Sequence, residues 1–332
     1  MHSTHRLRSS SHQDAGFSLA ELLVSMGILV TVSSVVFGGV MNLTQLNQTV
    51  TNRTEMFAGV RNASALLQQE VGQAGSAALP GSRTRLSAAV GAAGVATVGV
   101  TAEAPVTPAM VAGAMFIGEL LIVDTGANEE TVTVTGLGAG TFTATFTTAH
   151  AVGARLVPAG GFAAGVLPLA NPPVTNPVTP ATLNGSSGSV LKVFGDIHGN
   201  GSMVYVEYTC NTAQRVLYRK SQAWNDAVKV APGVEEVLVN NLLPNPDGSP
   251  CFTYKTLIVA GTVYVVSVAI TLTVETEAKD PITGLKQQEQ KALLNVSPRN
   301  VFNTWQIASL GLTNRVQPTP TEIVVNLLPA LY

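Results

Sequence analysis

The stretch "DIHGNGSMVYVE", residues 196 to 207, is the part of the sequence that comes nearest to a metal-binding pattern. Imidazole is a poor calcium ligand where Asp or Asn is expected, and the flanking residues are typical of strands rather than helices. We therefore expect a hairpin turn and no cofactor here, with Ca²⁺ as the alternative. The residues at loop positions one, three, five, six and twelve are Asp196, His198, Asn200, Gly201 and Glu207.

Patterns for catalysis are missing elsewhere in the sequence. It contains no H-E-x-x-H, G-x-S-x-G or P-loop lysine motif. The carboxylate pairs Glu129–Glu130 and Glu235–Glu236 are adjacent in sequence, so on a strand their members face opposite sides. His150 follows a Thr-rich stretch and is expected in a turn. We expect a protein that is not an enzyme.

The two cysteines, Cys210 and Cys251, indicate one disulfide if this part of the chain is exported to an oxidising compartment. Two buried free thiols are the alternative. The absence of a C-x-x-C pattern leaves a redox motif or a zinc ribbon without support.

Charge is scarce and unevenly placed along the chain. Charged residues make up 11% of the sequence and the net charge is −2, so we expect no nucleic-acid partner. Arg6 and Arg8 precede a run from Phe17 to Met41 in which Glu21 is the only formal charge. That run has the length of a membrane-spanning helix, and the basic leader predicts export of everything after it. The run is longer than the apolar region of a cleaved signal peptide and lacks a clean A-x-A site at its far end, so we expect a retained anchor in the inner membrane.

The six residues Gly16-Phe17-Ser18-Leu19-Ala20-Glu21 resemble the processing site of type IV prepilins and pseudopilins. The resemblance implies that a prepilin peptidase cuts after Gly16 and methylates the new amine on Phe17. It also implies that Glu21 pairs with the N-terminal amine of a neighbouring subunit during assembly. A buried charge without a partner is strongly unfavourable, so such pairing would fix the axial register of adjacent helices. An ordinary signal anchor, with Glu21 at the level of the lipid headgroups, is the alternative.

Apolar residues continue at helical spacing beyond the membrane run, which predicts one helix from about Phe17 to about Gln73. Gly72, Gly75 and Pro80 are expected to end it. The first half would form the bilayer or filament core, and the second half would lie on a globular head. A plain coiled-coil stalk is the alternative. The apolar stripe consists of Leu43, Leu46, Val50, Phe57, Val60, Leu67 and Val71.

The rest of the chain alternates apolar and polar residues, which is typical of half-buried strands. We therefore predict an α+β fold, with a long N-terminal helix followed by an antiparallel β-rich head. The expected segments are a leader at 1–16, the helix segment at 17–79 with its membrane part at 17–41, an inserted β-rich module at 80–168, a Pro/Asn/Ser/Gly-rich linker at 169–189, and the head at 190–332.

The second β region, which closes on "VSPRN" at 296–300, resembles the C-terminal part of PilW-type minor pilins and J-type minor pseudopilins. The resemblance implies a minor type IV pilin that helps to initiate or cap a pilus. Its partners would be the prepilin peptidase, other pilin subunits and an inner-membrane assembly platform, and it would end in a pilus or a periplasmic pseudopilus. The alternatives are a minor pseudopilin of a type II secretion system, a DNA-uptake pilus component, and a signal-anchored extracytoplasmic binding domain or enzyme.

Overall fold

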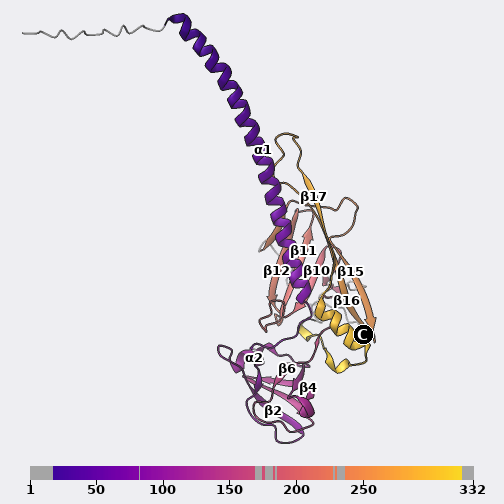
Figure 1. Ribbon diagram of the computed structural model, residues 1–332. Coiled ribbons are helices and arrows are strands. Elements are labelled where there is room, and N and C mark those ends of the chain that lie inside the picture. Colours follow the sequence, from indigo (N-terminus) through magenta and orange to yellow (C-terminus); the bar gives the residue numbers. More distant parts are fainter. Residues whose placement is uncertain are drawn as a thin grey trace, which may run out of the picture.

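The computed structural model describes residues 18–81, 83–168, 174–175, 182–183, 185–226, 229 and 236–323. The leader expected at 1–16 and Phe17 lie outside these residues, as does most of the linker expected at 169–189. One helix, α1 (Leu19–Gln73), leaves a β-rich body and extends far beyond it (Figure 1). The α+β prediction is confirmed.

Helix α1 is 55 residues long, or about 80 Å at 1.5 Å per residue. It ends where the sequence predicts, at Gln73. Gly75 follows with a positive φ of 82°, a backbone conformation that glycine adopts without steric cost. The chain then turns away and enters the β-rich body.

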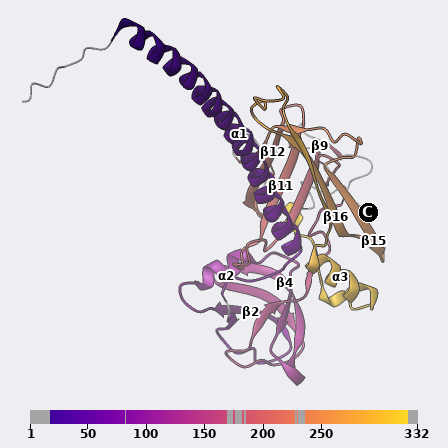
Figure 2. The ribbon, with the colours of Figure 1, turned by 45° about the horizontal axis from the view of Figure 1, so that its top comes forward.

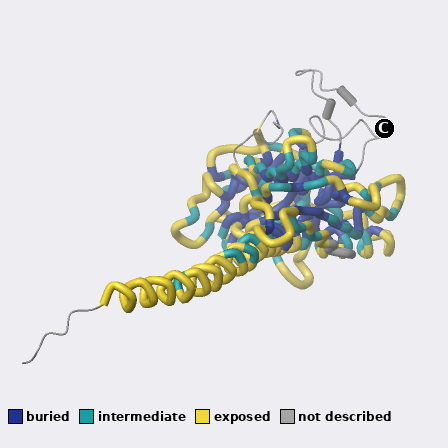
Figure 3. Tube along the Cα trace, turned by 90° about the horizontal axis from the view of Figure 1, so that it is seen from above, coloured by how far each residue is buried: buried dark blue, intermediate teal, exposed yellow. Residues whose placement is uncertain are grey.

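Only the last part of α1 is packed against the body, as the burial colours in Figure 3 show. Val60, Leu67 and Val71 are buried, but Leu43 and Val50 of the same apolar stripe are exposed. The stripe is therefore buried in the core from Val60 onward. Before Val60 the helix contacts the head only in part, since Met56 packs at the edge of the core and Arg53 Nε donates to Gln287 Oε1.

Two antiparallel sheets form the head, and the end of α1 packs into the core that they share. In the first sheet the order is β10-β11-β12-β13, and in the second it is β14-β16-β15 with β17 paired to β16. The strands are β10 (Val190–Gly195), β11 (Val204–Asn211), β12 (Val216–Ala223), β13 (Val237–Asn240), β14 (Leu242–Leu243), β15 (Phe252–Val259), β16 (Thr262–Glu275) and β17 (Gln288–Val296).

The inserted segment forms a second β body with its own core, at the end of the head opposite the protruding helix (Figures 1 and 2). Its sheet order is β1-β2-β5-β4-β3-β6. A bridge between Arg85 and Arg155 joins the two ends of this sheet, so the strands close into a small barrel. Its elements are β1 (Arg85–Leu86), β2 (Gly94–Thr101), α2 (Pro108–Ala114), β3 (Leu120–Val123), η1 (Gly126–Asn128), β4 (Glu130–Gly138), β5 (Thr141–Phe146) and β6 (Leu156–Pro158).

The barrel and the head are joined by the segment after α1 and by several short elements. The segment that follows α1 passes between the barrel and the head, where Gly75 N donates to Phe194 O at 2.9 Å and Phe162 N donates to Gly75 O at 2.9 Å. The remaining elements are β7 (Gly161–Phe162), β8 (Val174–Thr175), β9 (Thr182–Leu183), α3 (Arg299–Ser309), η2 (Thr313–Arg315) and β18 (Val316–Gln317), which pairs in parallel with β7.

Three details differ from the sequence-based expectations. The alternating stretch at 141–150 predicts one strand, but β5 ends at Phe146 and His150 lies beyond it. Helix α2 arises in a segment whose periodicity is weak, where Thr107 caps the helix and Pro108 begins it. Helix α3 lies in the head, where the sequence analysis names no helix, and it packs Val301 and Ala308 against the second head sheet and β7.

Candidate functional site

The most conspicuous surface of the protein is the apolar face of α1 that no other described element covers. An 18-residue window of this helix has a mean hydropathy of 2.1 and none of it is buried. It is the only described helix long and apolar enough to cross a membrane. Water solvates such a surface poorly, and a large uncovered apolar surface is typical of a membrane-spanning segment or of a contact with other helices. Its exposed large side chains up to Met41 are Leu19, Leu22, Leu23, Val24, Met26, Ile28, Leu29, Val30, Val32, Val35, Val36, Phe37, Val40 and Met41.

Glu21 lies in the first turn of this surface, where it caps its own helix. Ser18 N donates to the Glu21 carboxylate at 3.0 Å, and Glu21 N donates to the Ser18 hydroxyl at 3.1 Å. This reciprocal pair is a capping box, which satisfies two backbone donors at the helix start. Glu21 is exposed, so its second carboxylate oxygen remains accessible to an added cation. Gly16 and Phe17, the expected processing residues, lie outside the described residues.

Three glycines lie within the apolar surface at positions where the protein's own chain leaves room for a larger side chain. A Cβ atom added at Gly27, Gly38 or Gly39 would meet nothing within 4 Å. Glycine costs about 1 kcal/mol relative to alanine inside a soluble helix. Small residues allow helix backbones to approach closely within a membrane, so these positions are suited to contacts with other helices.

A buried ion pair fastens the other end of α1 to the head. Arg219 of β12 donates to Glu70 through Nε at 3.1 Å and through Nη2 at 2.5 Å, and Tyr208 of β11 donates its hydroxyl to the same carboxylate. Burial alone would lower the pKa of the Arg219 guanidinium, but the hydrogen bonds to Glu70 outweigh that effect and raise it. The sequence analysis missed this contact, because residues 149 positions apart meet only through the fold.

Cys210 and Cys251 form the predicted disulfide, with Cα atoms 6.5 Å apart. Cys210 belongs to β11 of the first head sheet, and Cys251 directly precedes β15 of the second. The bond therefore connects the two sheets across the core that also receives α1.

The calcium-like stretch forms a turn between β10 and β11. The Asp196 carboxylate accepts bonds from Asn200 N and Gly201 N, both at 3.0 Å, and so holds the turn closed. Glu207 lies further along β11, opposite Lys192, and accepts a bond from the Tyr205 hydroxyl. The three candidate ligands therefore do not converge. No group of three or more His, Cys, Asp or Glu among the described residues is arranged to hold a metal ion.

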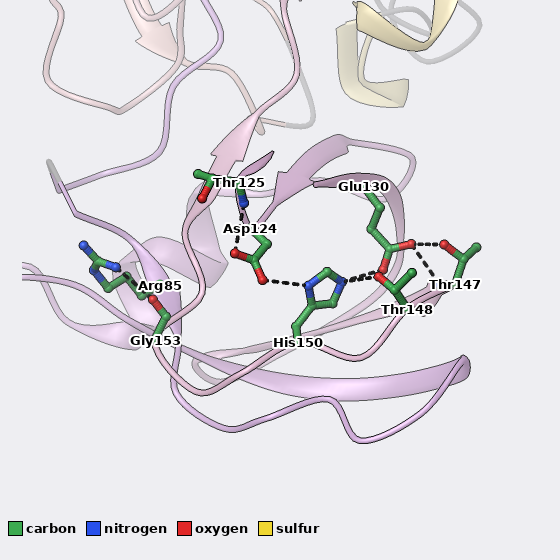
Figure 4. Close-up of polar contacts among 8 residues, drawn as sticks. All are labelled: Arg85, Asp124, Thr125, Glu130, Thr147, Thr148, His150 and Gly153. Atoms are coloured by element: carbon green, nitrogen blue, oxygen red, sulfur yellow. Dashed lines mark hydrogen bonds and ion pairs between the residues drawn. The ribbon is translucent and has the colours of Figure 1, made fainter. Parts of the chain in front are cut away.

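A buried histidine between two carboxylates is the polar cluster that the sequence analysis missed (Figure 4). His150 Nδ1 lies 3.3 Å from Asp124 Oδ2, and Nε2 lies 2.6 Å from Glu130 Oε1. Asp124 follows β3, Glu130 begins β4 and His150 follows β5, so the ring fastens three strand ends together. Burial alone would raise the pKa of Glu130, but bonds from Thr147 and His150 outweigh it and lower that pKa.

This cluster is arranged for structure rather than catalysis. The His150 side chain has no exposed surface, and Phe146 packs on its ring with centroids 5.7 Å apart. A substrate therefore has no route to either ring nitrogen. The only sequence signal was the presence of three polar residues near strand ends, which many loops share.

Glu119 is a second buried carboxyl in the barrel. It is 1% exposed and accepts a bond from Phe116 N at 3.3 Å. Burial raises the pKa of this carboxyl to about 8, and the bond from Phe116 only partly offsets that effect. Glu119 is therefore mainly protonated at neutral pH.

Comparison with protein-family models, with curated proteins and with solved structures finds no match for this chain.

Proposed function

We propose that the protein is a minor type IV pilin, made as a membrane-anchored precursor and assembled through α1. The observation that carries this proposal is the combination of Glu21 at the start of an uncovered apolar helix with a β-rich head on the other end of that helix. In a helix that serves only as an anchor, a carboxylate at this position has the local capping role alone, against the cost of a charge in an apolar segment.

Assembly would follow from the physics of α1. In the proposed filament the apolar surfaces of neighbouring α1 helices cover one another, and Gly27, Gly38 and Gly39 permit close approach. Cleavage after Gly16 would create an ammonium group on Phe17. The Glu21 carboxylate of a neighbouring subunit would form an ion pair with it. The capping box leaves the Glu21 carboxylate at the helix end, where an incoming subunit would present its N-terminus.

The head would be displayed outside the membrane, and its structure suits such a position. The disulfide links its two sheets, which is typical of an oxidising compartment. The Glu70–Arg219 pair would transmit force between the assembled helix and the head. The proposed role is to initiate or cap a pilus, and a minor pseudopilin of a type II secretion system has the same requirements.

The first experiment is the N-terminal mass of the protein purified from its native membrane. A start at methylated Phe17 is the expected result. A start at Met1, or cleavage elsewhere, would contradict the pilin and pseudopilin proposals together. It would leave a signal-anchored extracytoplasmic domain, for which the capping box gives Glu21 a purely local role.

A pair of Glu21 variants separates the local role from the assembly role. Glutamine also completes a capping box, so Glu21→Gln keeps the helix cap and removes only the charge. Glu21→Val removes both. We expect both variants to be processed normally and to be lost from filaments, as measured by immunoblot of sheared pili. If Glu21→Gln assembles like wild type, the charge has no role in assembly.

A further inference from the structure

The two ends of the barrel sheet meet at a pair of arginines. Leu86 N donates to Ala154 O at 2.9 Å, and Leu156 N donates to Thr84 O at 3.0 Å. The residues between these bonds, Arg85 and Arg155, therefore form a non-hydrogen-bonded antiparallel pair, the kind in which facing side chains lie closest.

Like charges directly opposite one another destabilise a sheet. Arg85 directs one guanidinium nitrogen to Gly153 O at 2.8 Å, a bond that leaves its charge uncompensated (Figure 4). The Arg155 guanidinium makes no hydrogen bond or ion pair with any described residue. The barrel thus closes on two cations without an anion between them.

A third arginine faces the same space. Arg83, Arg85 and Arg155 line a pocket of about 430 Å³, and the described lining contains no carboxylate. Arg83 pairs with Glu103 at 3.1 Å, but both side chains are more than half exposed, so this ion pair contributes little in water. The other walls are largely apolar, formed by Ala77, Ala78, Leu79, Leu156, Val157 and Pro158.

We propose that this pocket binds a small organic anion through a phosphate or carboxylate group. The planar guanidinium binds either group with two parallel bonds, and the two facing arginines can hold one anion between them. The pocket is larger than a bare phosphate requires and lies within the usual range for small-molecule sites, so the apolar walls would contact the carbon skeleton. A bound anion would offset the repulsion at the barrel seam, and it would connect the segment after α1 with β6.

The test uses the full-length protein in a non-ionic detergent, with inorganic phosphate and citrate as separate probes. Sodium chloride keeps the ionic strength constant, so that general screening does not contribute. Calorimetric titration and the thermal unfolding midpoint are measured for wild type, Arg155→Gln and Arg61→Gln. Arg61 is the control because it is an exposed arginine on α1, outside the pocket.

We expect saturable binding to wild type and to Arg61→Gln, with affinity at least about ten-fold weaker in Arg155→Gln. Binding of phosphate alone identifies a phosphorylated ligand, and binding of citrate alone identifies a carboxylate ligand. No saturable binding of either probe, or equal binding to Arg155→Gln, overturns the proposal.

The stability without added anion is a second readout. Relief of the Arg85–Arg155 repulsion should leave Arg155→Gln at least as stable as wild type at low ionic strength. A purely structural role for Arg155 gives the opposite result, a variant that unfolds at lower temperature without any probe. That outcome would also count against the site.

Discussion

Arg219 of β12 binds both carboxylate oxygens of Glu70, and this pair is the polar centre of the contact between α1 and the head. The surrounding contact is apolar, formed by Val60, Ala63 and Leu67 of the helix. Apolar contacts alone do not fix how far a helix slides along a sheet. The ion pair does fix it, because its geometry allows only one register.

Loss of this pair should destabilise the head strongly. Glu70→Gln leaves the Arg219 guanidinium with one carboxylate, Glu236, and should reduce the free energy of unfolding by roughly 3–5 kcal/mol. Urea unfolding followed by the fluorescence of Trp224 and Trp305 measures the change. Ser64→Ala is the matched control on the same helix face. The Ser64 hydroxyl is buried without a described partner, so its removal should be neutral or stabilising. A loss below about 1 kcal/mol in Glu70→Gln would contradict the role of the pair.

The disulfide makes a separate contribution to the stability of the head. Cys210 and Cys251 are 41 residues apart, and closing a loop of that size stabilises by about 4 kcal/mol in the chain-entropy model. Cys210→Ser with Cys251→Ser should lower the urea midpoint accordingly, and a reducing agent should lower that of wild type but not that of the double variant. Equal sensitivity of both proteins to the reductant would show that another effect is responsible.

How far the sequence predicts the structure depends on whether the signal is local. The end of α1 at Gln73 and the alternation in β4 and β5 are set by neighbouring residues, and the sequence analysis predicts both correctly. The Cys210–Cys251 pair was predictable because no other cysteine competes. Gly16 and Phe17 lie outside the described residues, so their processing stays a prediction.

The missed features depend on contacts between distant residues. Glu70 is one acid on a polar helix face until β11 and β12 place Tyr208 and Arg219 beside it. His150 is expected in a turn because it follows a Thr-rich stretch, and neither Asp124 nor Glu130 is near enough in sequence to indicate the cluster. The arginine pair of the barrel seam arises from strand closure, which alternation patterns do not specify.

The raised pKa of Glu119 predicts that the barrel loses stability as pH rises. The pKa of Glu119 is about 8 in the folded protein, against the ordinary glutamate value of 4.5 in the unfolded chain. The contribution of the protonated Glu119 carboxyl to the free energy of unfolding is fully present below pH 4.5. It is lost as the pH increases to about 8. Glu119→Gln removes this dependence and should be more stable than wild type at pH 7 by roughly 3 kcal/mol.

Thermal unfolding of both proteins between pH 5 and pH 8.5 tests this prediction about Glu119. Trp224 reports on the region, because its ring lies 5.9 Å from that of Phe116, which binds the Glu119 carboxyl. Glu55→Gln, a change to an exposed acid on α1, is the control and should follow wild type. Parallel curves for wild type and Glu119→Gln would contradict the buried-acid account.

The lowered pKa of Glu130 predicts the opposite dependence in acid. Its stabilising contribution is present above the unfolded-state value of 4.5 and is lost as pH falls through the folded-state value. Glu130→Gln should therefore be less stable than wild type at pH 7, and the difference should shrink below pH 4.5. His150 is the titratable group bonded to Glu130, and Asp124 is bonded to the other nitrogen of that ring, so His150→Gln serves as the companion variant. A stability difference that does not change with pH would show that shape, and not charge, matters at this position.

Close backbone packing between the segment after α1 and the segment that follows β7 makes Gly165 intolerant of a side chain. A Cβ atom at this position would overlap the Gly75 backbone and lie 2.7 Å from Val301 Cγ2. Gly165→Ala should therefore reduce the free energy of unfolding by about 1–3 kcal/mol, the usual range for overpacking. Gly72→Ala is the matched control, because a Cβ there meets nothing within 4 Å and alanine favours the helix. Urea unfolding of both variants compares the two sites. If Gly165→Ala is as stable as Gly72→Ala, the segment after α1 is free to shift away from the segment that follows β7, and the close contact at Gly75 does not hold these two segments together.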